Sequence, residues 1–226
     1  MNTMRRRWGV GAFAAALALG CSAQNKVSPG ALMLMLTTDA PAAASSLSFG
    51  EVTVVLDDSR SSGRQVRVFQ VEPSDLPQTL TIAAKSEAGG SVTKIQVFAF
   101  DDEGSLRIFR EAIVPIPSTG IQMLRMPLNV ACDRVYPAGV CPPAQSCGGS
   151  PRRACADAET CVDGACQAVG VPEVTLPMYT DGAEGTCVAP GVRAQCDAAA
   201  TECGPIISAD ACGEVKVIDC GACGTP

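Results

Sequence analysis

Seven short runs of apolar and alternating residues fill the chain between Ala31 and Asn129. Alternation is clearest in Gln65–Val68 and Thr79–Ile82, where one side chain in two is apolar, which is the period of a strand with one buried face. Clusters of Asp, Ser and Gly separate the runs and predict turns. The pattern predicts seven strands, at residues 31–37, 51–57, 64–71, 78–84, 93–101, 105–116 and 121–128.

Strands at this spacing, with no long helical period, predict an all-β domain over residues 31–130. We expect an antiparallel β-sandwich, immunoglobulin-like or transthyretin-like, and a small barrel is the alternative.

The rest of the chain lacks this pattern and is dense in cysteine. Twelve of the 13 cysteines lie in the last 95 residues, about 13% of the segment that they span, which is typical of a disulfide scaffold. We predict a small, loop-dominated tail with two disulfide-rich modules, residues 131–170 and 171–226, whose stability comes from bridges rather than from a large core. The pairing is open; the predicted disulfide cysteines are Cys132, Cys141, Cys147, Cys155, Cys161, Cys166, Cys187, Cys196, Cys203, Cys212, Cys220 and Cys223.

The N-terminus has the layout of an export signal. Three arginines at 5–7 precede an apolar run from Trp8 to Gly20, which is too short to span a bilayer as a helix. The run ends in LALGCS, which resembles the lipobox of bacterial lipoproteins. The resemblance implies that residues 1–20 are removed, that Cys21 carries the acyl chains, and that residues 21–30 form a lipidated tether. Ser22 implies the outer membrane; secretion or a periplasmic location is the alternative.

Three further motifs resemble bacterial surface proteins. TTDAP, at residues 37–41, resembles the start of a β-sandwich family found in bacterial lipoproteins. CVDGACQ, at 161–167, and the Cys-Gly steps at 203, 212, 220 and 223 resemble cysteine-rich repeats of myxobacterial surface proteins. Together they imply a cysteine-rich outer-membrane lipoprotein of unknown activity.

Composition excludes several functions. Without the three signal arginines, the chain has 14 basic and 23 acidic residues, so we expect no basic surface that could bind nucleic acid. The chain has no histidine, which excludes Ser-His-Asp and Cys-His catalysis and imidazole metal sites.

Two kinds of candidate chemistry remain. Cys220 and Cys223 have the spacing of redox and zinc motifs. The strand and helix context of a thioredoxin site is missing, and so is the second closely spaced cysteine pair of a zinc site. We therefore expect both cysteines to form structural disulfides. The acidic clusters at 57–58 and 101–103 could bind calcium or supply acid and base, but both lie in predicted turns, where aspartate caps backbone N–H groups. We therefore assign no catalytic residue, cofactor or metal.

The expected function is that of a non-catalytic cell-envelope lipoprotein with a structural or interaction role. Its partners would be the membrane, through the N-terminal lipid, and other envelope proteins. The alternative is a secreted disulfide-rich binding or inhibitor module that uses a disulfide-fixed loop, and a more remote one is an enzyme based on carboxylates.

Overall fold

The computed structural model describes residues 30–39, 47–58, 63–83, 92–170, 176–179, 191–210 and 212–223. The predicted signal peptide, the predicted lipid-attachment residue Cys21, most of the predicted tether and Cys187 lie outside the described residues. The described chain is mostly β-strand, with several sheets and one α-helix. Within it, no helix has the length and apolar composition needed to cross a membrane.

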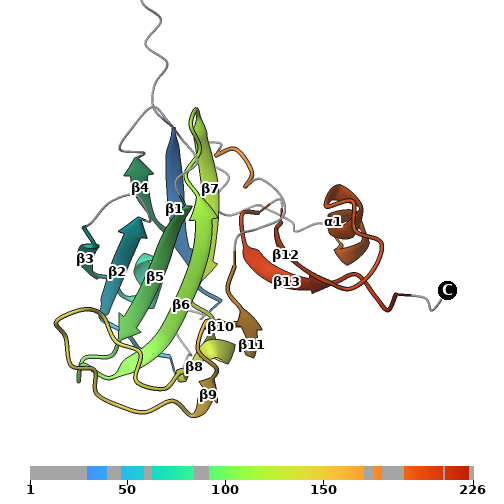
Figure 1. Ribbon diagram of the computed structural model, residues 1–226. Coiled ribbons are helices and arrows are strands. Elements are labelled where there is room, and N and C mark those ends of the chain that lie inside the picture. Colours follow the sequence, from blue (N-terminus) through green and yellow to red (C-terminus); the bar gives the residue numbers. More distant parts are fainter. Residues whose placement is uncertain are drawn as a thin grey trace, which may run out of the picture.

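All seven strands predicted between residues 31 and 128 are present, with ends that differ from the prediction by at most one residue (Figure 1). They form two sheets. The three-stranded sheet has the order β4-β1-β7, and the four-stranded sheet has the order β3-β2-β5-β6. The strands are β1 (Ala31–Thr37), β2 (Glu51–Asp58), β3 (Gln65–Gln70), β4 (Gln78–Ala83), β5 (Val92–Phe100), β6 (Leu106–Pro115) and β7 (Ile121–Pro127).

One pairing differs from the expected antiparallel arrangement. β1 runs antiparallel to β4 but parallel to β7, with Leu34 opposite Leu124. The other pairs of the two sheets are antiparallel. The pattern of apolar residues could not report this, because it shows which face of a strand is buried and not the direction of its neighbour.

The two sheets bury a common apolar core between them. Every second residue of β1 and of β2 enters this core, as the two-residue period of a strand requires. β5 and β6 contribute in the same way. The inward residues of these four strands include Leu32, Leu34, Leu36, Val52, Val54, Leu56, Ile95, Val97, Ala99, Ile108, Ala112 and Val114.

The first part of the cysteine-rich tail packs directly on this domain. Cys132, Val135, Cys155 and Cys161 belong to the same apolar core as the two sheets. Tyr136 joins a second cluster on the outer face of the four-stranded sheet, beside Phe98 and Phe109 on β5 and β6. The secondary structure here is a 3₁₀ turn, η2 (Val130–Cys132), and the short strands β8 (Val135–Pro137), β9 (Arg153–Cys155), β10 (Glu159–Val162) and β11 (Ala165–Ala168).

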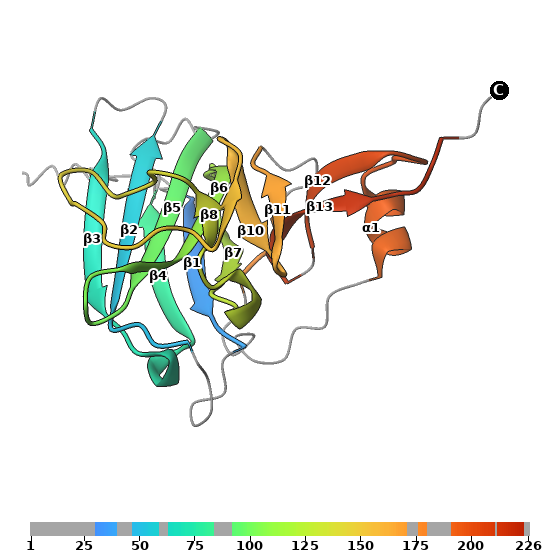
Figure 2. The ribbon, with the colours of Figure 1, turned by 90° about the horizontal axis from the view of Figure 1, so that it is seen from below.

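The last part of the tail is smaller and stands to one side of the sheets (Figures 1 and 2). It contains the helix α1 (Val192–Ala198) and a hairpin of β12 (Pro205–Ala209) and β13 (Val215–Asp219). Its own cluster of buried apolar residues is only Cys196, Ile206 and Ile218. The helix was not predicted, because seven residues are too few to show a helical period.

The tail also covers two sheet edges. At the edge of β7, Met123 N–H donates to Pro177 O at 2.8 Å, and Arg125 N–H donates to Gly213 O at 2.6 Å. At the edge of β6, Leu106 N–H donates to Gly148 O, and Arg134 N–H donates to the carbonyl of Arg107. An exposed edge strand can pair with a strand of another chain, so covering these edges guards against aggregation.

Candidate functional site

The cysteines form a framework of structural disulfides. Five bonds are described in full: Cys132–Cys161, Cys141–Cys147, Cys155–Cys166, Cys196–Cys220 and Cys203–Cys223. Cys212 is disulfide-bonded as well, so all eleven cysteines in the described part of the chain are oxidised. Such a framework indicates an oxidising, extracytoplasmic environment.

The terminal C-x-x-C motif is divided between two bonds. Cys220 is joined to Cys196, and Cys223 is joined to Cys203, so the two cysteines of the motif are not bonded to each other. A dithiol redox site needs that mutual bond, and a zinc site needs thiolates. The motif therefore fixes the ends of the last module.

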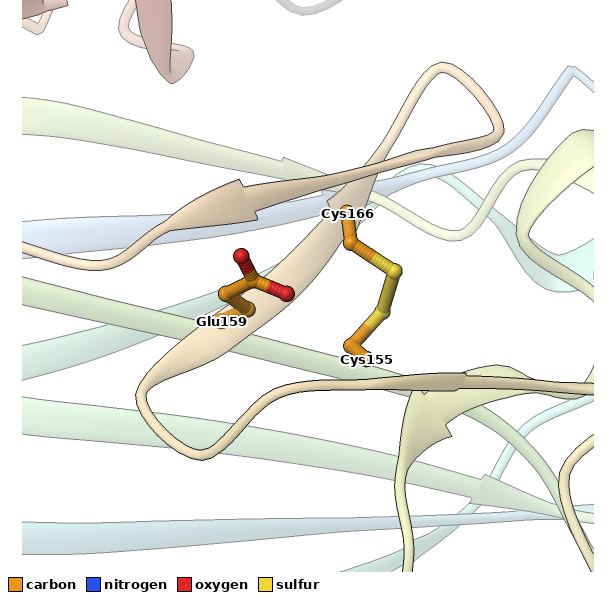
Figure 3. A group of neighbouring side chains, drawn as sticks. All are labelled: Cys155, Glu159 and Cys166. Atoms are coloured by element: carbon orange, nitrogen blue, oxygen red, sulfur yellow. A yellow bond between two sulfur atoms is a disulfide. The ribbon is translucent and has the colours of Figure 1, made fainter.

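One cluster has the composition of a metal site but not its chemistry. Cys155, Glu159 and Cys166 lie close enough to share an ion (Figure 3). The two sulfurs are bonded to each other, which leaves no thiolate to bind a metal. The Glu159 carboxylate accepts a hydrogen bond from the backbone N–H of Ala156 at 2.8 Å, so it closes the turn before β10.

The acidic cluster at 101–103 is placed in a turn, where the sequence predicts it. Asp101 Oδ1 accepts hydrogen bonds from the N–H groups of Glu103 and Ser105, at 3.1 and 2.8 Å. Arg107 lies 3.9 Å from Asp101 and makes a bond of 2.8 Å to Asp133, which raises the pKa of the guanidinium. At the other cluster, Asp57 forms an exposed ion pair with Arg64 at 3.1 Å.

A polar cleft of about 420 Å³ opens beside the 101–104 turn. Gly50 and Glu51, at the start of β2, form one wall together with Gln70 at the end of β3. The turn forms the second wall, and Gln145 and Ser146, from the tail, form the third. Three carboxylates, two side-chain amides and a hydroxyl thus meet in one cavity, which Phe100 also lines.

The third wall of the cleft is held rigidly. The disulfide between Cys141 and Cys147 closes a short loop around Gln145 and Ser146. The loop is fastened to the β5–β6 turn because Gly148 N–H donates to Gly104 O at 3.2 Å, while Gly148 O accepts from Leu106. Ordering this loop in advance lowers the entropy cost of binding a ligand against it.

Asp102 closes the cleft toward β2. A Cβ atom placed on Gly50 would lie 2.6 Å from Asp102 Oδ1, so the carboxylate packs directly over the glycine. Glu51 is held from the other side by Gln70, whose amide donates to its carboxylate at 3.3 Å. The resulting site is negatively charged and suited to hydrogen bonding with a polar ligand. Sequence reasoning identified the turn at 101–103 but not Gln70, Gln145 or Ser146, because only the fold brings them together.

A second group of polar residues is buried where the tail meets the β domain. Arg110 on β6 is 2% exposed and lies 3.7 Å from Glu214. Asp210, which is also 2% exposed, pairs with Lys216 at 3.3 Å. Arg110 occupies an inward position between Ile108 and Ala112, and a charge at such a position is the sequence signal that could have identified this group.

Burial shifts the pKa values of this pair in opposite directions. Loss of solvation lowers the pKa of Arg110, and it raises the pKa of Glu214. The attraction between the two charges opposes both shifts but is the smaller effect. The Arg110–Glu214 pair therefore forms a buried contact between β6 and the turn before β13.

Comparisons with known proteins give no further guide to the chemistry of either site. No protein-family model, no curated protein and no solved structure matches the chain. A proposal about function must therefore rest on the disulfide framework, the cleft and the signals in the sequence.

Proposed function

We propose that the protein is a non-catalytic lipoprotein of the cell envelope, attached to the outer membrane through lipid on Cys21, and that it acts by binding. The observation that carries the proposal is the oxidised framework: eleven described cysteines are in disulfides, in a chain that begins with an export-type sequence. A reducing compartment would not maintain such a framework.

The cleft under the Cys141–Cys147 loop is the binding site in this proposal. Its support is the combination of a preformed cavity, polar groups from three separate segments and a wall held by a disulfide. The same loop is the working surface of the alternative function, a secreted binding or inhibitor module. Lipid attachment distinguishes the two.

For the β domain we propose the transthyretin-like rather than the immunoglobulin-like type of sandwich. An immunoglobulin sandwich puts its first, second, fourth and fifth strands in one sheet. Here the second and fifth strands share a sheet with the third and sixth instead. Nuclear magnetic resonance contacts between β1 and β7 in parallel register would support this type, and antiparallel contacts would contradict it.

Lipid attachment is tested by Cys21→Ser, with Ser22→Ala as the matched control. We expect the control to remain in the membrane fraction with the mass of an acylated chain. The Cys21→Ser variant should lose the lipid mass and keep its signal peptide. If this variant matures and fractionates like the parent, the lipoprotein proposal is wrong.

Binding at the cleft is tested by placing a photo-crosslinking amino acid at Ser146 in living cells. The control position is Thr79, an exposed residue of β4. Irradiation should give a defined adduct to an envelope component from position 146 and not from position 79. Equal adducts at both positions, or none at 146, would count against the cleft. A panel of proteases assayed with the purified protein tests the inhibitor alternative.

A further inference from the structure

The hairpin β12–β13 meets the β domain through a small apolar contact and a few hydrogen bonds. Ala209 of β12 is buried in the main core, and Val215 of β13 packs against that core. Gly213 O accepts from Arg125 N–H on β7, and Val217 N–H donates to Gln167 Oε1 at 2.8 Å. None of the five disulfides described in full joins residues 191–223 to residues 132–170. The hairpin is thus held by its fit to the β7 edge, by the apolar contacts of Ala209 and Val215, and by the charges beneath it.

That fit depends on a glycine. Gly213 has a φ of +78°, and a Cβ atom there would lie 2.5 Å from the Met123 carbonyl oxygen. The turn before β13 is shaped by Asp210, whose Oδ1 accepts from the N–H groups of Cys212 and Glu214 at 2.9 and 3.0 Å. A side chain at position 213 would therefore push the hairpin off the edge of β7.

The charges beneath the hairpin are poorly satisfied. Arg110 Nη2 lies 3.7 Å from Glu214 Oε1, which is longer than a hydrogen bond. In the described part of the chain, Arg110 Nε, Arg110 Nη1 and Glu214 Oε1 have no hydrogen-bond partner. A buried ion pair with incomplete hydrogen bonding recovers less energy than its two charges lose on leaving water.

The electrostatics of Glu214 agree with this geometry. The charged groups around it are Arg110 on β6, Lys216 on β13, Asp210 at the end of β12 and Asp163 in the β10–β11 turn. Arg125, opposite Glu214 at the edge of β7, directs its Nε to Thr37 Oγ1 at 3.2 Å. Burial nevertheless raises the pKa of Glu214, so solvation lost on docking exceeds the attraction gained.

We propose that the hairpin β12–β13 is a releasable cover over the edge of β7, and that the buried Arg110–Glu214 pair keeps its attachment weak. Apolar side chains at these two positions would hold the hairpin more firmly. On release, both charges regain water, and the N–H of Arg125 becomes free at the edge of the sheet. This inference does not depend on the proposed binding function.

The sign of the pH dependence follows from the raised pKa of Glu214. The docked hairpin binds a proton on Glu214 more readily than the released hairpin does. The hairpin therefore docks more strongly as the pH falls from the raised pKa of Glu214 to the ordinary pKa of glutamate. Outside that interval, Glu214 does not contribute to the pH dependence of docking. Glu214→Gln should abolish this dependence.

The test is amide hydrogen exchange on the mature, disulfide-bonded protein, with protection factors corrected for intrinsic rates. In the parent, the amides of Arg125 and of the hairpin should exchange through a local opening, well before those of β1. Arg110→Met with Glu214→Met should raise protection of Arg125 and the hairpin roughly tenfold or more, with β1 unchanged. Gly213→Ala should remove the same protection.

Two results would overturn the proposal. One is a double variant with hairpin protection equal to or below that of the parent. The other is a parent in which hairpin and β1 amides exchange together, which would mean that the hairpin leaves only on global unfolding. Glu214→Gln gives a milder second test, since loss of the pH dependence is expected without a change of fold.

Discussion

The two halves of the cysteine-rich tail look alike in sequence but relate differently to the β domain. Residues 132–170 place four residues in the main core and Tyr136 in the outer cluster. The hairpin and helix of residues 191–223 bury Ala209 in the main core and otherwise have a separate cluster of three buried apolar residues. In the first half, the disulfides join segments that already pack on a large core. In the second half, where the core is small, the disulfides supply stability that apolar burial would otherwise provide.

The difference shows that cysteine density does not define a domain. A change in composition at residue 131 predicts a boundary, but the packing continues across it, because Cys132, Val135 and Cys161 lie against the sheets. The tail also completes hydrogen bonding along the edges of β6 and β7, while β3 and β4 remain sheet edges in the described part of the chain. The first half is thus part of the structural unit that it follows.

The sharpest way to test this difference is truncation. A chain ending at residue 130 should lose about 3–6 kcal/mol of unfolding free energy in the β domain from Val135 and Tyr136 alone, because each is worth roughly 1.5–3 kcal/mol when buried. A chain ending at residue 170 should keep most of that stability. Urea denaturation followed by circular dichroism measures both. Equal stability of the two truncations would mean that the halves do not differ.

Removing a single disulfide should lower the stability by less than truncation does, and the loss should again be larger for a bond in the first half of the tail. Cys132→Ala with Cys161→Ala opens a loop with a sequence separation of 29 and should destabilise the β domain by about 3–4 kcal/mol. Cys203→Ala with Cys223→Ala should leave the β-domain transition in place and loosen only the last module. Denaturation and limited proteolysis measure the two effects. A shift of the β-domain transition by the second pair would contradict the comparison.

Removing the buried hydroxyl group of Tyr136 should cause the smallest loss of stability. Tyr136 donates to Leu106 O at 3.1 Å, so Tyr136→Phe should cost about 1 kcal/mol. Burial raises the pKa of Tyr136, so the folded protein should lose stability as the pH rises from the ordinary pKa of tyrosine through the raised one. That alkaline loss should be smaller in Tyr136→Phe. An unchanged loss would show that Tyr136 is not its source.

The local features of this protein could be predicted from its amino-acid sequence. Alternation and turn residues located all seven strands of the β domain, since burial of one face leaves a two-residue period in each strand. The count and position of the cysteines predicted the disulfide framework. Asp101 was predicted to cap a turn, because that role depends only on neighbours within a few residues.

The contacts between distant segments, in contrast, could be learned only from the folded structure. The parallel pairing of β1 with β7, the disulfide partners and the insertion of Cys132 and Val135 into the core leave no periodic signal in the chain. The cleft is a further case, because Glu51, Gln70 and Ser146 come from segments that are far apart in sequence. A local pattern records whether a side chain is buried, whereas the identity of its neighbour depends on how the whole chain closes on itself.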